Sequence, residues 1–169
     1  MTRRYVDEII MKKPADKNSY LAEIPAVRFL EKKGSLTIDS DVTFLVGENG
    51  TGKSTLIEAI AVACGFNPEG GTKNFSFSTS GDGENFHSEL WEHIAVSRSR
   101  YPKDGFFLRA ESFFNAASYI DELDKIPAAS PKIIGGYGGK SLHEQSHGES
   151  FLALVKNRFF GSGLYILDE

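Results

Sequence analysis

A glycine-rich segment with one lysine and neighbouring hydroxyl residues is the part of this chain best suited to chemistry. Residues 47–55 read Gly-Glu-Asn-Gly-Thr-Gly-Lys-Ser-Thr, with the spacing of a phosphate-binding loop. Glycines allow successive backbone N–H groups to point inward at an anion. Lys53 can reach the β- and γ-phosphates of a nucleotide, and Ser54 can place its hydroxyl on Mg²⁺. The segment therefore predicts a site for a nucleoside triphosphate with magnesium.

The flanking sequence predicts the strand and the helix that such a loop needs. Val42–Val46 is a short apolar run directly before the loop and predicts a buried parallel strand. After the loop, Gly65 stands where a helix would end. The apolar residues that recur between them at helical spacing are Leu56, Ile57, Ile60, Ala61 and Cys64. The alternative is a glycine-rich turn between a strand and a helix that binds no ligand.

Two acids follow an apolar run at the far end of the sequence. Leu164–Leu167 predicts a strand, and Asp168 and Glu169 come directly after it. Any strand can end in acids where it meets water, but downstream of a phosphate-binding loop this pattern resembles a Walker B strand. Asp168 would then hold Mg²⁺ through water, and Glu169 would orient or deprotonate the attacking water.

A third motif precedes that strand. Ser146 and Glu149 have the spacing of a capping box, which predicts a helix that begins at Ser146 and presents an anion site. The segment Gln-Ser-His-Gly-Glu over residues 145–149 resembles the signature motif of ATP-binding-cassette (ABC) ATPases. His147 replaces the first glycine of that motif and Gln145 replaces its leucine. The alternative is an ordinary capped helix.

Taken together, the motifs resemble an ABC-type ATPase, closest to soluble stand-alone ATPases related to the RecF and structural-maintenance-of-chromosomes group. This resemblance implies one α/β domain over residues 1–169. The implied fold is a P-loop NTPase with a central, mainly parallel sheet, an N-terminal antiparallel β region and a helical lobe at roughly 110–158. The implied C-terminal strands are missing.

The resemblance also implies ligands and partners. The chain would bind ATP with Mg²⁺, hydrolyse ATP and form a homodimer on binding it, with Ser146 and Gly148 facing the γ-phosphate of the other subunit. Residues that would contact ATP are Gly47, Glu48, Asn49, Gly50, Thr51, Gly52, Lys53, Ser54 and Thr55. Lys53 and Glu169 would act in catalysis, and Ser54 and Asp168 would hold the metal.

Two further residues have open interpretations. Glu111 stands nearest to the glutamine of the family's Q-loop, so its carboxylate could ligate Mg²⁺ through water. It could equally be an acid favoured in the first turn of the next helix. Phe29 could stack on the nucleotide base, although a place in the core is the stronger expectation.

The rest of the chain predicts several elements without chemistry of their own. Strands are expected at Ser35–Asp39, Phe75–Phe77, Ile94–Val96 and Phe106–Leu108, and a helix from Phe113 to Leu123. Gly135–Gly139 predicts a mobile loop, serving as a linker or a nucleotide-linked lid. His143 and His147 lie four apart, but no third ligand is apparent, so a metal site between them is not expected.

Composition bounds the class of protein. The chain has 169 residues, enough for one domain, and a net charge of −4, which gives no general attraction to nucleic acid or to an anionic membrane. Cys64 is the single cysteine, so no intrachain disulfide forms and a cytoplasmic location is expected. Neither a signal peptide nor a membrane span is expected.

The function implied by the resemblance is a nucleotide-driven switch that acts on another molecule, such as DNA ends, a nuclease partner or a toxin in phage defence. One alternative is an ATP-dependent interaction module without useful hydrolysis, and another is the ATP-binding subunit of a transporter. The sequence ends at Glu169, where the family continues with a D-loop, a core strand and a switch histidine. We therefore expect these 169 residues alone to hydrolyse ATP poorly.

Overall fold

The computed structural model describes residues 4–73, 88–110, 113–127, 131–159 and 161–168. Three expectations lie outside this range and are not tested by it: the strand at Phe75–Phe77, the Q-loop position Glu111 and the catalytic acid Glu169.

An antiparallel sheet is built mostly from the first forty residues. Strand β1 (Glu8–Met11) lies in the middle, with β2 (Ser35–Thr37) on one side and β3 (Ile94–Ser97) on the other. Next to this sheet are the 3₁₀ helix η1 (Tyr20–Glu23), helix α1 (Pro25–Lys33) and the short helix α3 (Leu90–His93). The antiparallel β region is confirmed, although β1 itself was not predicted.

A separate pair of parallel strands carries the acids at the end of the sequence. Strand β4 (Asp104–Arg109) pairs with β5 (Gly163–Asp168), so that Arg109 lies opposite Asp168. The predicted strand of residues 164–167 is thus confirmed. Although β3 and β4 follow one another closely along the chain, they belong to different sheets.

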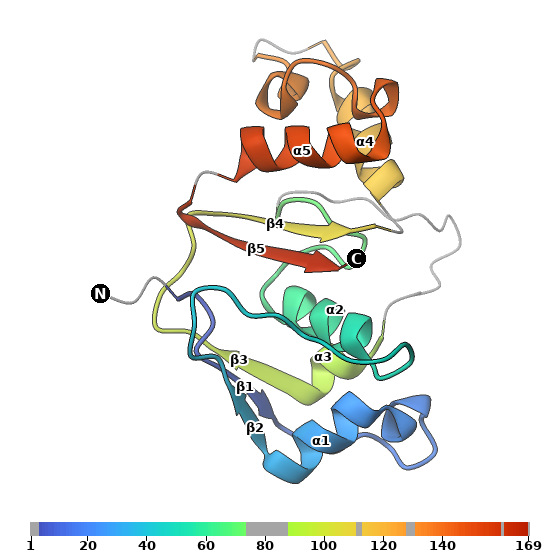
Figure 1. The fold of residues 1–169 in the computed structure, drawn as a ribbon, viewed down its shortest axis with the longest axis vertical. Coiled ribbons are helices and arrows are strands. Elements are labelled where there is room, and N and C mark those ends of the chain that lie inside the picture. The colour runs from blue at the N-terminus through green and yellow to red at the C-terminus, as the bar shows by residue number, and fades with distance from the viewer. Residues whose placement is uncertain (1–3, 74–87, 111–112, 128–130, 160, 169) are drawn as a thin grey trace.

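Helix α2 (Lys53–Ala63) lies between the two sheets (Figure 1). One face, with Leu56 and Ala59, joins the core of the antiparallel sheet. The other, with Ala61 and the adjoining Cys64, packs against Phe107 of β4. Because both faces are covered, the helix is apolar nearly all round.

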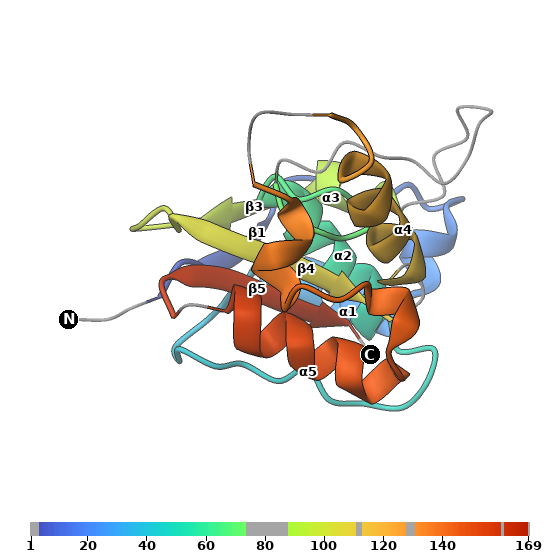
Figure 2. The ribbon, with the colours of Figure 1, turned by 90° about the horizontal axis from the view of Figure 1, so that it is seen from above.

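The opposite face of β4 is covered by a helical group. Helices α4 (Phe113–Leu123) and α5 (His147–Arg158) pack there with the 3₁₀ helices η2 (Ile133–Tyr137) and η3 (Leu142–Glu144) (Figure 2). Alternation along β4 explains the split, since Phe106 and Leu108 face this group while Phe107 faces α2.

The predicted strand at Val42–Val46 is wrong, because this segment has no strand conformation. It runs along the outside of the molecule between β2 and α2, and Phe44 and Val46 are 82% and 88% exposed. A strand needs a neighbouring backbone with which to form hydrogen bonds. None of the described strands pairs with this segment, so it forms no strand in spite of its β propensity.

The predicted mobile loop at Gly135–Gly139 also differs from the structure. Its first part belongs to η2, where Tyr137 is buried. The Asp124 carboxylate accepts hydrogen bonds from the backbone N–H groups of Ile133 and Ile134. The segment is therefore packed onto the helical group, through an aromatic residue that the glycine-rich pattern concealed.

Candidate functional site

The glycine loop (residues 47–55) leads directly into α2 and is held in a curled shape. Gly50 and Gly52 have φ angles of 80° and 91°, in the left-handed region that favours glycine. Thr51 donates from its hydroxyl to the carbonyl of Glu48 at 2.8 Å. These features give the backbone the concave form that a phosphate group needs.

The ammonium group of Lys53 lies over this loop. Its Nζ donates to the carbonyl oxygens of Gly47 and Glu48, both at 2.9 Å. Lys53 is the first residue of α2, and its side chain reaches back across the loop that precedes the helix. From that position it can exchange a carbonyl partner for a phosphate oxygen.

The start of α1 fixes the position of the loop, a role that the sequence did not reveal. A side chain at Gly52 would place its Cβ 2.1 Å from Ile24 Cγ2, so only glycine fits there. The N–H of Ala26 donates to the carbonyl of Thr51 at 3.0 Å. The loop is thus packed against the residues that begin α1.

Ser54 lies in the first turn of α2 and is exposed. Its hydroxyl and the carboxylate of Asp168, at the end of β5, are hard oxygen groups of the kind that Mg²⁺ prefers. The amino end of α2 and the carboxyl end of β5 lie on the same side of the molecule (Figure 1). The residues present therefore fit a magnesium–nucleotide complex in their chemistry.

A buried charge network connects Asp168 to the helix that follows the loop. The Arg109 guanidinium donates from Nη1 to Oε2 of Glu58 on α2 at 2.7 Å, and its Nε lies 3.9 Å from Oδ2 of Asp168. Glu58 also accepts a hydrogen bond from the N–H of Ser88 at 2.7 Å. The side chains of Glu58, Arg109 and Asp168 are 6%, 17% and 10% exposed.

This Glu58–Arg109–Asp168 network was not predicted. Glu58 and Arg109 lie far apart in the sequence, and a glutamate on an otherwise apolar helix gives no sign of its partner. The one available signal was that an acid interrupts the apolar pattern of α2, since a buried carboxylate requires a cation or hydrogen-bond donors.

The predicted capping box at Ser146 is confirmed. Helix α5 begins at His147, and Ser146 donates to Oε2 of Glu149 from its backbone N–H at 2.9 Å and from its hydroxyl at 2.6 Å. The hydroxyl bond, followed by the backbone bond, lowers the pKa of the Glu149 carboxyl. A Cβ at Gly148 would meet no atom within 4 Å, so another molecule can approach this helix end closely.

The amino end of α5 and the start of α2 lie on the same side of the molecule, with the parallel strands between them (Figure 1). Lys53 and Ser54 lie in the first turn of α2, Asp168 ends β5, and Ser146 and Gly148 lie at the amino end of α5. Phe29 is 51% exposed, so the expected place in the core is wrong. Stacking of Phe29 on a base stays a prediction.

Comparison with known families classifies the chain. A family model described as an AAA domain matches residues 23–125, which is more than half of the sequence. The chain belongs to this AAA domain family. The matched range includes the glycine loop, α2 and Arg109, and membership indicates a nucleotide-binding ATPase. No curated protein and no solved structure matches the chain.

The described residues contain neither a membrane-spanning helix nor a cluster of metal ligands. No described helix is both long enough and apolar enough to cross a bilayer. In the same part of the chain, no three His, Cys, Asp or Glu side chains are grouped to hold a metal ion.

Proposed function

We propose that this chain binds ATP with Mg²⁺ at the glycine loop and hydrolyses it as an ABC-type ATPase. The observation that carries the proposal is the arrangement of Lys53, whose ammonium lies over a loop of left-handed glycines at the start of α2. The family match supports ATPase activity in general. The ABC type rests on the resemblance of the second half of the chain to that family.

Each group has a defined part in this proposal. Backbone N–H groups of the loop and the amino end of α2 bind the phosphates, and Lys53 neutralises charge that develops on them. Ser54 and Asp168 hold Mg²⁺, which supplies Lewis-acid stabilisation of the phosphate oxygens. Glu169 acts as the base toward water, and Glu111 ligates the metal through water.

Dimer formation completes the proposal. Ser146 and Gly148 lie at the amino end of α5, where a Cβ on Gly148 would meet no atom within 4 Å. In the described part of the chain, no backbone hydrogen bond joins this helix end to the glycine loop. Such an end suits a phosphate presented by a second subunit. We propose that the two subunits close on ATP and open after hydrolysis. A role for this switch in DNA repair or phage defence, through a nuclease or other effector, belongs to the same proposal.

The binding step is tested by Lys53→Ala in isothermal titration calorimetry with Mg-ATP. The variant should lose measurable binding, because no other described cation bonds to the loop carbonyls. Lys12→Ala, which removes an exposed lysine on the antiparallel sheet side, is the matched control and should bind as the parent does. Equal ATP affinity in Lys53→Ala and the parent would overturn the proposed site.

A further inference from the structure

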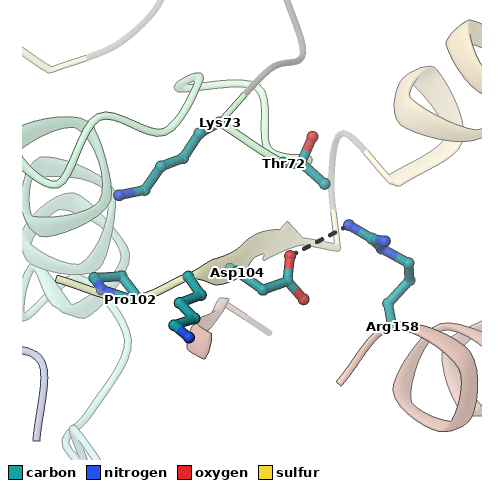
Figure 3. A pocket seen from close by; sticks show the side chains of 7 residues that line it. Thr72, Lys73, Pro102, Asp104 and Arg158 are labelled. Atoms are coloured by element: carbon teal, nitrogen blue, oxygen red, sulfur yellow. Dashed lines mark hydrogen bonds and ion pairs between the residues drawn. The ribbon is translucent and has the colours of Figure 1, made fainter. Parts of the chain in front are cut away.

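A second group of charged residues surrounds a pocket of about 190 Å³ (Figure 3). Residues that line it are Thr72, Lys73, Pro102, Lys103, Asp104, Gly105 and Arg158. They come from the segment after α2, from the start of β4 and from the end of α5. The pocket therefore lies at the amino ends of the parallel strands, whereas the glycine loop lies at their carboxyl ends (Figure 1).

The pocket is strongly positive for its size. Three cationic side chains, of Lys73, Lys103 and Arg158, line it together with one carboxylate, of Asp104, toward which Arg158 points (Figure 3). That local charge of +2 contrasts with the net charge of −4 of the whole chain. An excess of positive charge around one pocket attracts an anion.

Two of the three cations are held in place by aromatic rings. The Lys73 Nζ lies 5.2 Å from the centroid of the Phe66 ring, and the Arg158 guanidinium carbon lies 5.5 Å from that of Tyr137. Arg158 also contacts Asp104, with 3.4 Å between Nη2 and Oδ1. Cations that are already positioned lose less conformational entropy when they bind a ligand.

Lys73 and a further cation, Arg98, both act on the buried Cys64 thiol: burial raises its pKa, and the two positive charges act in the opposite direction. Arg158 is in the last turn of α5, where the helix dipole alone would favour a cation. The dipole does not account for Lys73 and Lys103, since neither belongs to that helix.

We propose that this pocket is a second anion site, which binds a phosphate group between Lys73, Lys103 and Arg158 independently of the glycine loop. Thr72 offers a hydroxyl donor beside them, and lysine and arginine donate charge-assisted hydrogen bonds to phosphate oxygens. Asp104 orients Arg158 and at the same time opposes the anion.

The test is a titration of the protein with inorganic phosphate, followed by amide chemical shifts in NMR spectra at constant ionic strength, with chloride as the reference salt. Phosphate should shift the amides of Lys73, Asp104 and Gly105, and should do so equally in the Lys53→Ala background. A second titration with ethyl phosphate shows whether a free phosphate or a phosphate monoester is preferred. Tighter binding of either one supports the site and assigns the source.

Variants distinguish binding from structural support. Lys103 is exposed and forms no ion pair with any described residue, so Lys103→Ala should leave the fold intact and weaken phosphate binding about tenfold. Lys12→Ala should leave it unchanged. Asp104→Asn should strengthen phosphate binding, an effect that a purely structural role for the pocket does not produce. Absent shifts, equal shifts with chloride, or unchanged binding in Lys103→Ala would overturn the proposal.

Discussion

At the residue scale, the buried Glu58–Arg109 ion pair contributes to stability. Arg109→Ala removes the guanidinium from the buried Glu58 carboxylate and leaves it the hydrogen bond from the Ser88 N–H. Removing one partner of a buried ion pair typically costs about 3–5 kcal/mol. We expect a loss toward the lower end, about 3 kcal/mol, in the free energy of unfolding measured with urea.

An exposed ion pair provides the control for that experiment. Arg4 Nη1 and Asp39 Oδ1 are 3.7 Å apart, and the Asp39 side chain is 85% exposed. Exposed pairs contribute about 0–1 kcal/mol, so Asp39→Ala should change the free energy of unfolding little. A similar, small loss in both variants would contradict the view that the Arg109 network is a buried structural joint between α2 and β4.

Glu149 should make stability depend on pH. Its carboxyl has a lowered pKa in the folded protein because Ser146 donates two hydrogen bonds to it. A lowered pKa means that this carboxylate stabilises the fold above its unfolded pKa, about 4.3, and that the contribution is lost as pH falls through the folded value. Glu149→Gln should therefore be less stable than the parent near neutral pH.

The difference in unfolding free energy between Glu149→Gln and the parent should shrink as pH falls below about 4. Urea titrations over this range check it. A difference that stays constant with pH would show that the variant acts through packing and not through the charge of Glu149.

At the scale of elements, the joint between α1 and the glycine loop depends on Gly52. Gly52→Ala must place a methyl group against Ile24, and its φ of 91° is unfavourable for alanine. Gly50→Ala has a similar φ of 80° but meets no atom within 4 Å. Gly50→Ala should cost about 1–2 kcal/mol from backbone strain alone.

Gly52→Ala should cost more than Gly50→Ala, by about 1–3 kcal/mol of overpacking. It should also lower ATP affinity, because α1 or the loop has to move. Thermal unfolding and calorimetry of the two variants test this ranking. If Gly50→Ala proves the more damaging, then the contact with Ile24 does not fix the loop.

Helices α2, α4 and α5 were predicted from this sequence because their signals are local, whereas α1 (Pro25–Lys33) was not predicted. For α2, residues 56–65 carry both a helical apolar period and a terminal glycine. For α5, Ser146 and Glu149 form the cap within one turn. The segment at Val42–Val46 failed for the opposite reason. Its composition favours a strand, but strand formation depends on a partner distant in the chain, and local sequence does not contain that information.

The candidate site divides in the same way. Lys53, Ser54 and the glycines lie in one contiguous motif, so their arrangement followed from spacing. The roles of Ile24, Glu58 and Arg109 depend on contacts across long stretches of chain, which no local pattern predicts. Glu111 and Glu169 lie outside the described residues and stay predictions.

At the scale of the whole molecule, the arrangement of its two sides defines what each can bind. The start of α2, the carboxyl end of β5 and the amino end of α5 share one side, and the basic pocket lies at the amino ends of the parallel strands (Figure 1). A second subunit that brings its α5 to the glycine loop would therefore leave the basic pocket of each subunit accessible. Nucleotide-driven dimerisation and phosphate binding in the pocket can be measured separately.

The dimer prediction is tested in a protein carrying Glu169→Gln, which should retain ATP because its proposed base is removed. Light scattering should show a monomer without nucleotide and a dimer with saturating Mg-ATP. Adding Ser146→Asp should abolish the dimer. Aspartate can still cap the helix through its carboxylate oxygen, although it loses the hydroxyl donated to Glu149, and it places a negative charge against the γ-phosphate of the other subunit.

Ser146→Asn is the matched control for that variant, since it keeps both the cap and the absence of charge. The Ser146→Asn variant should dimerise nearly as well as the Glu169→Gln protein. The monomers of the Ser146→Asp and Ser146→Asn variants should bind ATP with the affinity of the Glu169→Gln monomer. A monomer at saturating Mg-ATP in the Glu169→Gln protein would contradict the composite site. A dimer that survives Ser146→Asp would show that the subunits meet through some surface other than the amino end of α5.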